Sequence, residues 1–342
     1  MCIRDRIYIP ITRGELWDES EEKKNRRLAI YAVLNEVLKT LDILIHPFCP
    51  FTSEHLYQTV FEGKQSILLD KWPQYKESLV NEEIEESFDI MKDTVSISAA
   101  ARMKGKLKRR WPLNEAQICV KKNQKVKLES LSDLLKSQLN VEKFNIVETE
   151  KESGLEQLLE LKGLGLPVKS TLELERKKIG PKAKQHMGKL VSTFSETNPD
   201  EIISSIQKDG KYDFKIDDDI ISLDKEDFIV DFDSKENFAV AKRDGFTVFI
   251  STSRNKEMMA KGLVKDIARR LQTLRKERGY NPTDVLEVAS ILELDEESLE
   301  MIKEKNEELA FLVRVKKVNF EKSCKEYKDD DIDGQKIKIS VE

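Results

Sequence analysis

The sequence predicts an α+β protein of more than one domain, with an α-helical bundle first and a mixed α+β module after it. Its 342 residues exceed the ~100–200 of a usual single domain. Apolar residues recur at helical spacing through residues 21–45, and after residue 110 short β-branched runs alternate with helical stretches. The predicted divisions are a bundle at 1–113, a small βαβ-type appendage at 114–150, a linker at 151–180 and an α+β module at 181–342.

Three helices are predicted in the bundle. The first covers residues 21–45 and ends where two prolines, Pro47 and Pro50, prevent it from continuing. A capping sequence at residues 52–54 begins a second helix, which runs to about residue 61. The third opens near residue 81 and continues to about residue 103. Because each helix has one apolar face, we expect them to pack as an antiparallel bundle.

Strands and helices alternate in the rest of the chain. A break is expected at residues 154–167, a turn at Gly180-Pro181, and the end of a long helix at Gly279. The five strands between residues 212 and 251 lie close together in sequence, as in one antiparallel sheet. The predicted helices are 127–138, 182–194, 199–208, 256–278 and 296–313, and the predicted strands are 116–120, 144–147, 212–216, 220–223, 228–232, 238–242, 246–251, 286–294 and 316–320.

Composition excludes several classes of protein. Charged residues make up 36% of the chain, above the roughly one quarter of an average globular protein. The most apolar stretch, residues 38–51, contains Asp42, His46 and two prolines, so it does not fit a membrane span. Residues 1–6 are charged with no apolar run after them, unlike a secretory signal. The four cysteines lie far apart with no C-x-x-C pair. We therefore expect a cytoplasmic protein with no membrane partner.

Residue patterns for catalysis and for metal binding are missing from the sequence. His46 and His55 are nine residues apart, whereas ligands on one helix need a spacing of three or four. His46, next to Pro47, is expected to be a packing or capping residue. There is no Gly-x-Ser-x-Gly elbow and no phosphate-binding glycine loop with its lysine. We expect no catalytic residue and no metal ligand in this chain.

Positive charge is concentrated in two segments, although the net charge is −5. Residues 102–110 contain six cations and no anion, and residues 254–278 contain nine cations and three anions. Residues 200–236, in contrast, contain 13 acidic and 5 basic residues. This distribution suits a polyanion that binds at chosen places while the rest of the surface repels it.

The first basic segment has two interpretations. If it is extended, its alternating cations share one face, and each phosphate they neutralise releases counterions from a nucleic acid. The adjacent Trp111 can then stack on an unpaired base. In the other interpretation the segment is a solvated loop and Trp111 is buried against the bundle. The candidate cations here are Arg102, Lys104, Lys106, Lys108, Arg109 and Arg110.

The second basic segment also has two interpretations. Lys261, Lys265 and Arg269 follow one face of the predicted helix at residues 256–278, while its apolar residues follow another. That face suits the backbone of an RNA. It also suits packing on the acidic sheet before it, where the carboxylates of residues 217–219 would answer the lysines.

Segments spread over nearly the whole chain resemble the class I synthetases for isoleucine, valine and leucine. Residues 48–57 and 66–73 are similar to the P-F-x-P-F-x-x-E-x-x-Y and S-V-H-x-x-x-W-P segments of their anticodon-binding bundle, and residues 8–17 to its R-x-x-x-W opening. The isoleucyl-tRNA synthetases of the archaeal and eukaryotic type are the most similar of these. Four segments of this chain carry the similarity. Residues 101–113 correspond to the family's A-R and K-x-R-x-P-L segments, and residues 180–182 to its G-P-K. Residues 237–241 correspond to its G-F-A-V-A, and residues 262–276 to its G-L-x-R-x-x-x-R-x-I-Q-x-L-R-K.

This resemblance implies the C-terminal part of an isoleucine-tRNA ligase, which binds the anticodon stem and loop of isoleucine tRNA. The H-I-G-H and K-M-S-K-S segments that bind ATP in the family are missing, so ATP and magnesium would belong to the full-length enzyme. The expected partners are tRNA and the family's catalytic and editing domains, and not DNA. The sequence departs from the family at three positions. Lys261 stands where the family usually has Glu, Asp266 stands where it has a variable apolar or acidic residue, and Pro10 interrupts the opening helix.

Two alternatives stay open. The chain can be the same module of a valyl- or leucyl-tRNA synthetase, although a valyl enzyme would end in a heptad-repeat arm rather than in strand, helix and strand. It can also be a non-catalytic interaction protein whose basic segments bind a protein partner. Binding of tRNA but not duplex DNA, weakened by salt, would favour the synthetase interpretation.

Overall fold

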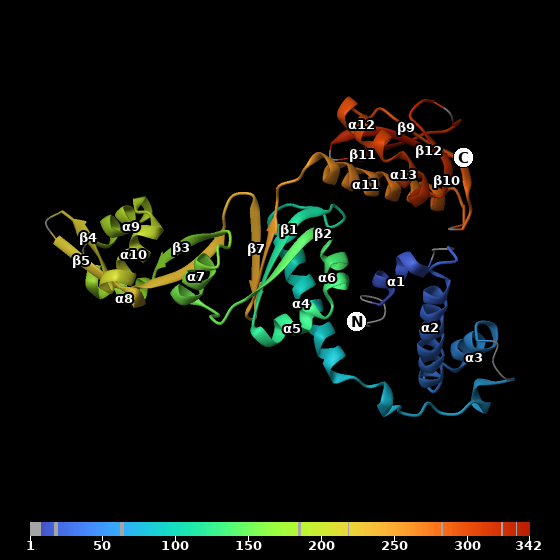
Figure 1. Ribbon diagram of the computed structural model, residues 1–342, viewed down its shortest axis with the longest axis horizontal. Helices are drawn as coiled ribbons and strands as arrows, with labels where there is room; N and C mark the ends of the chain where they lie inside the picture. Colours follow the sequence, from blue (N-terminus) through green and yellow to red (C-terminus); the bar gives the residue numbers. More distant parts are fainter. Residues whose placement is uncertain are drawn as a thin grey trace. The chain divides into compact units, whose positions relative to one another are not determined.

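A computed structural model describes residues 8–16, 20–61, 65–183, 186–217, 219–281, 283–322, 324–332 and 334–342. The chain divides into two compact units, Met1–Glu85 and Glu86–Glu342 (Figure 1). No helix of these residues is long and apolar enough to cross a membrane.

The first unit is helical, as the sequence predicts. α2 ends at Ile45, just before Pro47, and α3 begins with Pro50 in its first turn, where a proline has no hydrogen bond to lose. His46 lies in the loop between them, and its Nδ1 is 2.8 Å from the Ser53 hydroxyl. The elements are α1 (Ile9–Leu16), α2 (Lys24–Ile45), α3 (Pro50–Thr59) and the 3-10 turns Ile67–Leu69 and Glu77–Leu79.

Two side chains of α3 hold the segment that follows it. Glu54 accepts hydrogen bonds from the Ser66 hydroxyl at 3.0 Å and from the Ile67 amide at 3.1 Å. Tyr57, only 1% exposed, donates to Asp70 at 2.7 Å. The Glu and Tyr of the E-x-x-Y segment therefore act inside the unit and stabilise its loop.

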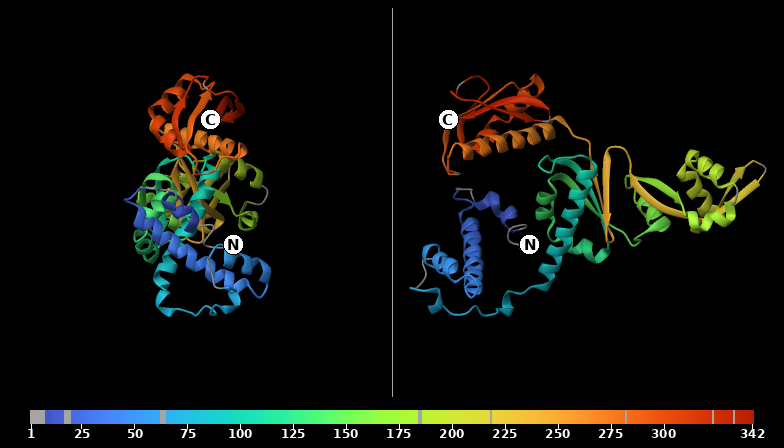
Figure 2. Two further views of the ribbon diagram at one scale, coloured as in Figure 1. Left: turned by 90° about the vertical axis from the view of Figure 1, so that its right-hand side faces the viewer. Right: turned by 180° about the vertical axis from the view of Figure 1, so that it is seen from behind.

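The second unit begins with α4 (Glu82–Lys104), whose first residues belong to the first unit. α4 runs beside a four-stranded sheet of order β2-β1-β8-β7, which Figure 2 shows from behind. β1 and β2 are parallel, and the chain between them forms α5 and α6. The sequence predicts one helix between these two strands, and the structure has two. The elements are β1 (Leu113–Val120), α5 (Lys122–Glu129), α6 (Ser132–Leu139), β2 (Val141–Glu148), β7 (Phe238–Arg243) and β8 (Phe246–Ser251).

A second lobe of this unit lies between β2 and β7 in sequence. Its hydrophobic core includes three residues of the sheet, Cys119, Val240 and Phe249. Burial in this core raises the pKa of the Cys119 thiol to about 12. After a first helix at Gly154–Gly163, the described residues of this lobe form three more α-helices and four strands. They are α7 (Gly154–Gly163), β3 (Val168–Leu174), α8 (Arg176–Ala183), α9 (Met187–Glu196), α10 (Pro199–Asp209), β4 (Lys211–Ile216), β5 (Asp219–Asp224), the 3-10 turn Lys225–Asp227 and β6 (Phe228–Ser234).

Three sequence predictions are wrong in this lobe. The linker at 151–180 and its break at 154–167 contain α7 and β3, whose Leu155, Leu158 and Leu161 are buried in the core. The Gly180-Pro181 turn lies inside α8. The five strands do not share one sheet, because β4 pairs with β5, β6 pairs with β3, and β7 and β8 join β1.

The last lobe packs helices on a sheet of order β10-β9-β12-β11. α11 begins at an Asn255 side chain that accepts the Met258 amide at 2.8 Å, and it ends before Gly279, whose φ of +79° suits glycine. The predicted final helix is two helices, and β11 and β12 are additions to the prediction. The elements are α11 (Lys256–Glu277), β9 (Leu286–Leu292), α12 (Glu296–Glu304), α13 (Asn306–Val313), β10 (Val315–Asn319), β11 (Lys328–Ile332) and β12 (Gln335–Val341).

Candidate nucleic-acid interface

The loop after α4 is organised by one buried arginine. The Arg102 side chain is 4% exposed, and its guanidinium donates to the carbonyl oxygens of two loop residues, Lys108 at 3.1 Å and Trp111 at 2.9 Å. It also donates to the carbonyls of Leu139 at 2.8 Å and Asn140 at 3.1 Å. Arg102 therefore ties the loop to the end of α6.

Burial lowers the pKa of Arg102 to about 10, with further lowering from nearby Arg109 and Arg254. The group still carries its charge at neutral pH, and that charge strengthens its four hydrogen bonds to carbonyl oxygens. Because the guanidinium is enclosed, Arg102 is a structural residue here and is not placed to contact a phosphate.

Trp111 is also buried, at 7% exposure, as the second interpretation of the segment expects. Its Nε1 donates to Asp266 Oδ2 at 2.9 Å. Gly262 of α11 faces its ring so closely that a Cβ there would be 2.4 Å from Cδ2 of the indole. Its ring is therefore packed against α11 and is not free to stack on a base.

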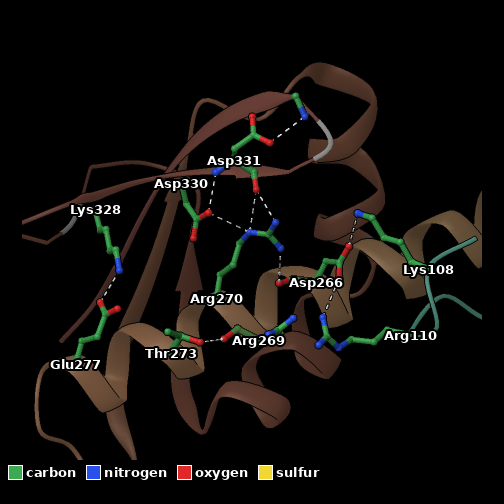
Figure 3. A network of polar contacts seen from close by, with 11 residues as sticks. Lys108, Arg110, Asp266, Arg269, Arg270, Thr273, Glu277, Lys328, Asp330 and Asp331 are labelled. Atoms are coloured by element: carbon green, nitrogen blue, oxygen red, sulfur yellow. Dashed lines mark hydrogen bonds and ion pairs between the residues drawn. The ribbon is translucent and has the colours of Figure 1, made fainter. Parts of the chain in front are cut away.

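Asp266 gathers the charges around this tryptophan. The side chain is 5% exposed, accepts a hydrogen bond from Lys108 Nζ at 2.9 Å and lies 3.8 Å from the Arg110 guanidinium (Figure 3). Burial raises the pKa of Asp266, but the hydrogen bonds from Trp111 and Lys108 outweigh it and leave the pKa below its usual range. Asp266 is thus ionised at neutral pH and holds two loop cations.

Around Asp266 the loop and α11 form a surface pocket of about 620 Å³, which we call the arginine pocket. Five of its lining side chains are cationic and two are carboxylates, so an excess of positive charge faces the pocket. α11 contributes residues at i, i+3, i+4 and i+7, which share one helix face. The lining residues are Lys108, Arg109, Arg110, Asp266, Arg269, Arg270, Thr273 and Asp330.

Only part of the predicted site is brought together in this pocket. The structure joins Lys108, Arg109 and Arg110 with Arg269, although Lys108 and Asp266 are 158 residues apart in sequence. Lys104 and Lys106 are exposed and do not line the pocket. The segment is not extended, because its start is the last turn of α4 and Lys106 has a φ of +53°. Its cations therefore do not alternate along one face.

Lys261 and Lys265 lie elsewhere on α11. Lys261 pairs with Glu257 at 2.8 Å and with Glu142 at 3.4 Å, and the hydrogen bond that it donates to Glu257 raises the pKa of Lys261. Lys265 Nζ is 3.5 Å from Asn140 Oδ1, and burial lowers its pKa. Both side chains bind the end of the α6–β2 region, so they support the packing of α11.

The acidic partners proposed for these lysines were wrong. Asp217 pairs with Lys189 at 2.5 Å, and Asp219 lies 3.1 Å from the His186 ring, both within the second lobe. Asp218 lies outside the described residues. The two lysines do support the packing of α11, but the carboxylate partners of Lys261 are Glu257 in the first turn of α11 and Glu142 in β2.

Four lining residues were not predicted as site residues from the sequence: Asp266, Arg270, Thr273 and Asp330. Arg270 donates to Asp330 Oδ1 at 3.3 Å and to the carbonyl oxygens of Asp331 and Asp266, each at 3.1 Å (Figure 3). Arg269, Arg270 and Thr273 stand on the same face as Asp266, and that spacing was available in the sequence. Asp330 was not, because its strand was not predicted.

The arrangement has the chemistry of an anion site. Among the described residues no group of three His, Cys, Asp or Glu side chains is placed to hold a metal ion. The guanidinium groups of the pocket offer planar, charged donors that match carboxylate and phosphate oxygens.

Comparisons with known proteins agree with the likeness found in the sequence. A family model described as the anticodon-binding domain of tRNA ligase matches residues 3–118. The isoleucine–tRNA ligase of Sulfolobus acidocaldarius is 28% identical over 283 residues, which are 82% of this chain and 26% of that protein. Those of Methanothrix thermoacetophila and Clostridium kluyveri are each 28% identical, over 350 and 348 residues, and each alignment covers 98% of this chain and 31% of the relative.

The chain thus spans less than a third of the length of these relatives. Residues 3–118 match the model of the anticodon-binding domain of tRNA ligase, and up to 98% of the chain aligns with a segment of isoleucine–tRNA ligases.

Proposed function

We propose that this chain is the tRNA-binding portion of an isoleucine-tRNA ligase and that it binds the anticodon stem and loop of isoleucine tRNA. The observation that carries the proposal is the arginine pocket, in which loop residues of the matched segment and a face of α11 present an excess of positive charge. The homology to isoleucine–tRNA ligases supports tRNA as the polyanion.

Phosphate groups of the tRNA backbone are the chemical features that this pocket would bind. Each phosphate neutralised by an arginine or lysine releases counterions, which makes affinity fall as salt rises. Exposed Lys104 and Lys106 lie in the same basic segment and would add contacts at its edge. Arg102 and Trp111 support this surface from beneath, while Lys261 and Lys265 fix α11.

The reaction served would be the ATP-dependent attachment of isoleucine to tRNA during translation in the cytoplasm. ATP and magnesium would be bound by the catalytic domain of the whole enzyme, together with an editing domain. The residues of this chain would position the tRNA for those domains. We therefore expect the purified chain to give no isoleucine-dependent ATP–pyrophosphate exchange, and measurable exchange would contradict this assignment.

Binding of three tRNAs tests the proposal. Gel shifts with isoleucine, valine and leucine tRNAs, and with a duplex DNA of matched charge, should give the tightest complex with isoleucine tRNA and weaker binding of DNA. A preference for valine or leucine tRNA would assign the module to that synthetase instead. No RNA binding at low salt would remove the proposal and favour a protein partner for the basic segments.

A further inference from the structure

We propose that Arg109 and Arg269 together bind a single phosphodiester group of the tRNA backbone, and that the other cations of the arginine pocket hold the pocket in shape. This inference rests on the proposed function and narrows it to two residues and one chemical group. It follows from how the charges inside the pocket are paired.

Three of the five cations already have carboxylate or carbonyl partners. Lys108 and Arg110 face Asp266, at 2.9 and 3.8 Å. Arg270 is held by Asp330 at 3.3 Å and by the backbone carbonyls of β11 and α11. A phosphate that approached these groups would have to compete with partners that belong to the fold.

Arg109 and Arg269 differ from them. Both side chains are exposed and both line the pocket, and the described residues include no ion pair or side-chain hydrogen bond of either guanidinium. One comes from the loop after α4 and the other from the middle of α11. They supply the excess charge of the pocket from two directions.

A phosphodiester group of the tRNA suits this pair. It carries one negative charge and two non-bridging oxygens, and each oxygen can accept from the planar fork of one guanidinium. The two carboxylates of the pocket, Asp266 and Asp330, oppose the entry of a second anion. We therefore expect one backbone phosphate to bridge the two arginines, with no reading of the base.

A double-mutant cycle on the whole chain tests the bridge. R109A and R269A should each weaken the binding of isoleucine tRNA about tenfold, which is the effect of losing one charge-assisted hydrogen-bonding group. Each should lower the slope of log affinity against log salt by about one unit. If one phosphate joins both side chains, R109A/R269A should bind nearly as well as either single variant.

K104A provides the matched control, because Lys104 carries the same charge in the same segment but lies outside the pocket. Its effect should add to that of R269A. In addition, R269K should keep the salt slope but lose affinity, since lysine keeps the charge without the fork. Melting temperatures of all these variants should match the unaltered chain, because both arginines are exposed.

Additive losses in R109A/R269A would mean two separate contacts and would overturn the bridge. Unchanged affinity and slope in both single variants would show that the pocket does not bind RNA, while leaving tRNA binding by the chain intact. Failure of the unaltered chain to bind any tRNA would instead refute the proposed function itself.

Discussion

Gly262 of α11 and Trp111 of the loop after α4 are in contact so closely that position 262 has no room for a methyl group. A Cβ on Gly262 would lie 2.4, 2.7 and 2.8 Å from three carbon atoms of the indole. This contact fixes the ring where its Nε1 reaches Asp266. The basic loop and the basic helix are therefore joined by an apolar contact as well as by charge.

G262A should destabilise the second unit despite the higher helix propensity of alanine. Propensity favours alanine by about 1 kcal/mol, but overpacking against a rigid ring costs about 1–3 kcal/mol and breaks the Trp111–Asp266 hydrogen bond. Urea unfolding should show a net loss of stability. G188A is the control, because a Cβ at Gly188 in α9 meets nothing within 4 Å. A G262A chain that is as stable as the unaltered chain, with an unchanged spectroscopic signal from the Trp111 indole, would contradict this packing.

R102K should reduce stability, whereas R109A should leave it unchanged. Lysine keeps the positive charge but cannot reach the four carbonyl oxygens that Arg102 binds, and each buried acceptor left unpaired costs about 1–3 kcal/mol. Arg109 is exposed and serves as the comparison. Thermal unfolding of the two variants measures the difference. Equal melting temperatures would mean that Arg102 does not organise the loop.

The first unit should become less stable in acid because the Asp70 carboxylate becomes protonated. The hydrogen bond from Tyr57, followed by that from Lys39, holds the pKa of Asp70 well below the usual ~3.9. Because the unfolded chain takes up this proton first, the contribution is complete above about pH 4 and is lost as pH falls through the folded pKa.

Comparison of the unaltered chain with D70N measures that contribution. The difference in unfolding free energy should be about 1–2 kcal/mol at pH 6, reduced by the partial exposure of the pair, and should decrease progressively as the pH falls from about 4 to 2. Y57F should show a smaller difference over the same pH range. A difference that stays constant from pH 6 to pH 2 would show that Asp70 is not ionised in the native state.

Local structure was predicted well wherever one segment carries its own signal. α2, α4 and α11 have long amphipathic patterns with prolines, asparagines or a glycine at their ends, and their predicted ranges agree with the structure. α7 was missed because Gly154 and Gly163 at its ends were interpreted as a break. Its leucines at 155, 158 and 161 were the better signal, since they share one helix face.

Pairing between distant segments could not be predicted in this way. β8 was predicted as a strand, but its pairing with β1 depends on the packing of the whole sheet. β11 has the sequence Lys-Asp-Asp-Asp-Ile, which has low strand propensity, and it forms because β12 places Lys336 and Lys338 opposite Asp331 and Asp329.

In the candidate site, too, local features could be predicted from the sequence and contacts between distant residues could not. Charge counting found both basic segments, and the resemblance predicted tRNA as their ligand. Neither could tell that Arg102 is enclosed by carbonyl groups or that Asp266 holds Lys108, because those contacts join residues far apart in sequence. Pairing with carboxylate and carbonyl groups in the folded chain, rather than charge in the sequence, separates Arg109 and Arg269 from the other cations of the arginine pocket.

Asp266 should limit the affinity of the arginine pocket, so D266N should bind tRNA more tightly. Asparagine keeps an oxygen that can accept from Trp111 Nε1, but it no longer neutralises Lys108 and Arg110. Those two cations would then be available to phosphates, and the salt slope should steepen by about one to two units. D329N is the control, because it removes the same charge from an exposed position of β11 outside the pocket. Tighter binding by D329N to the same degree would trace the effect to net charge alone. An unchanged slope in a folded D266N chain would mean that Lys108 and Arg110 stay withheld by other partners.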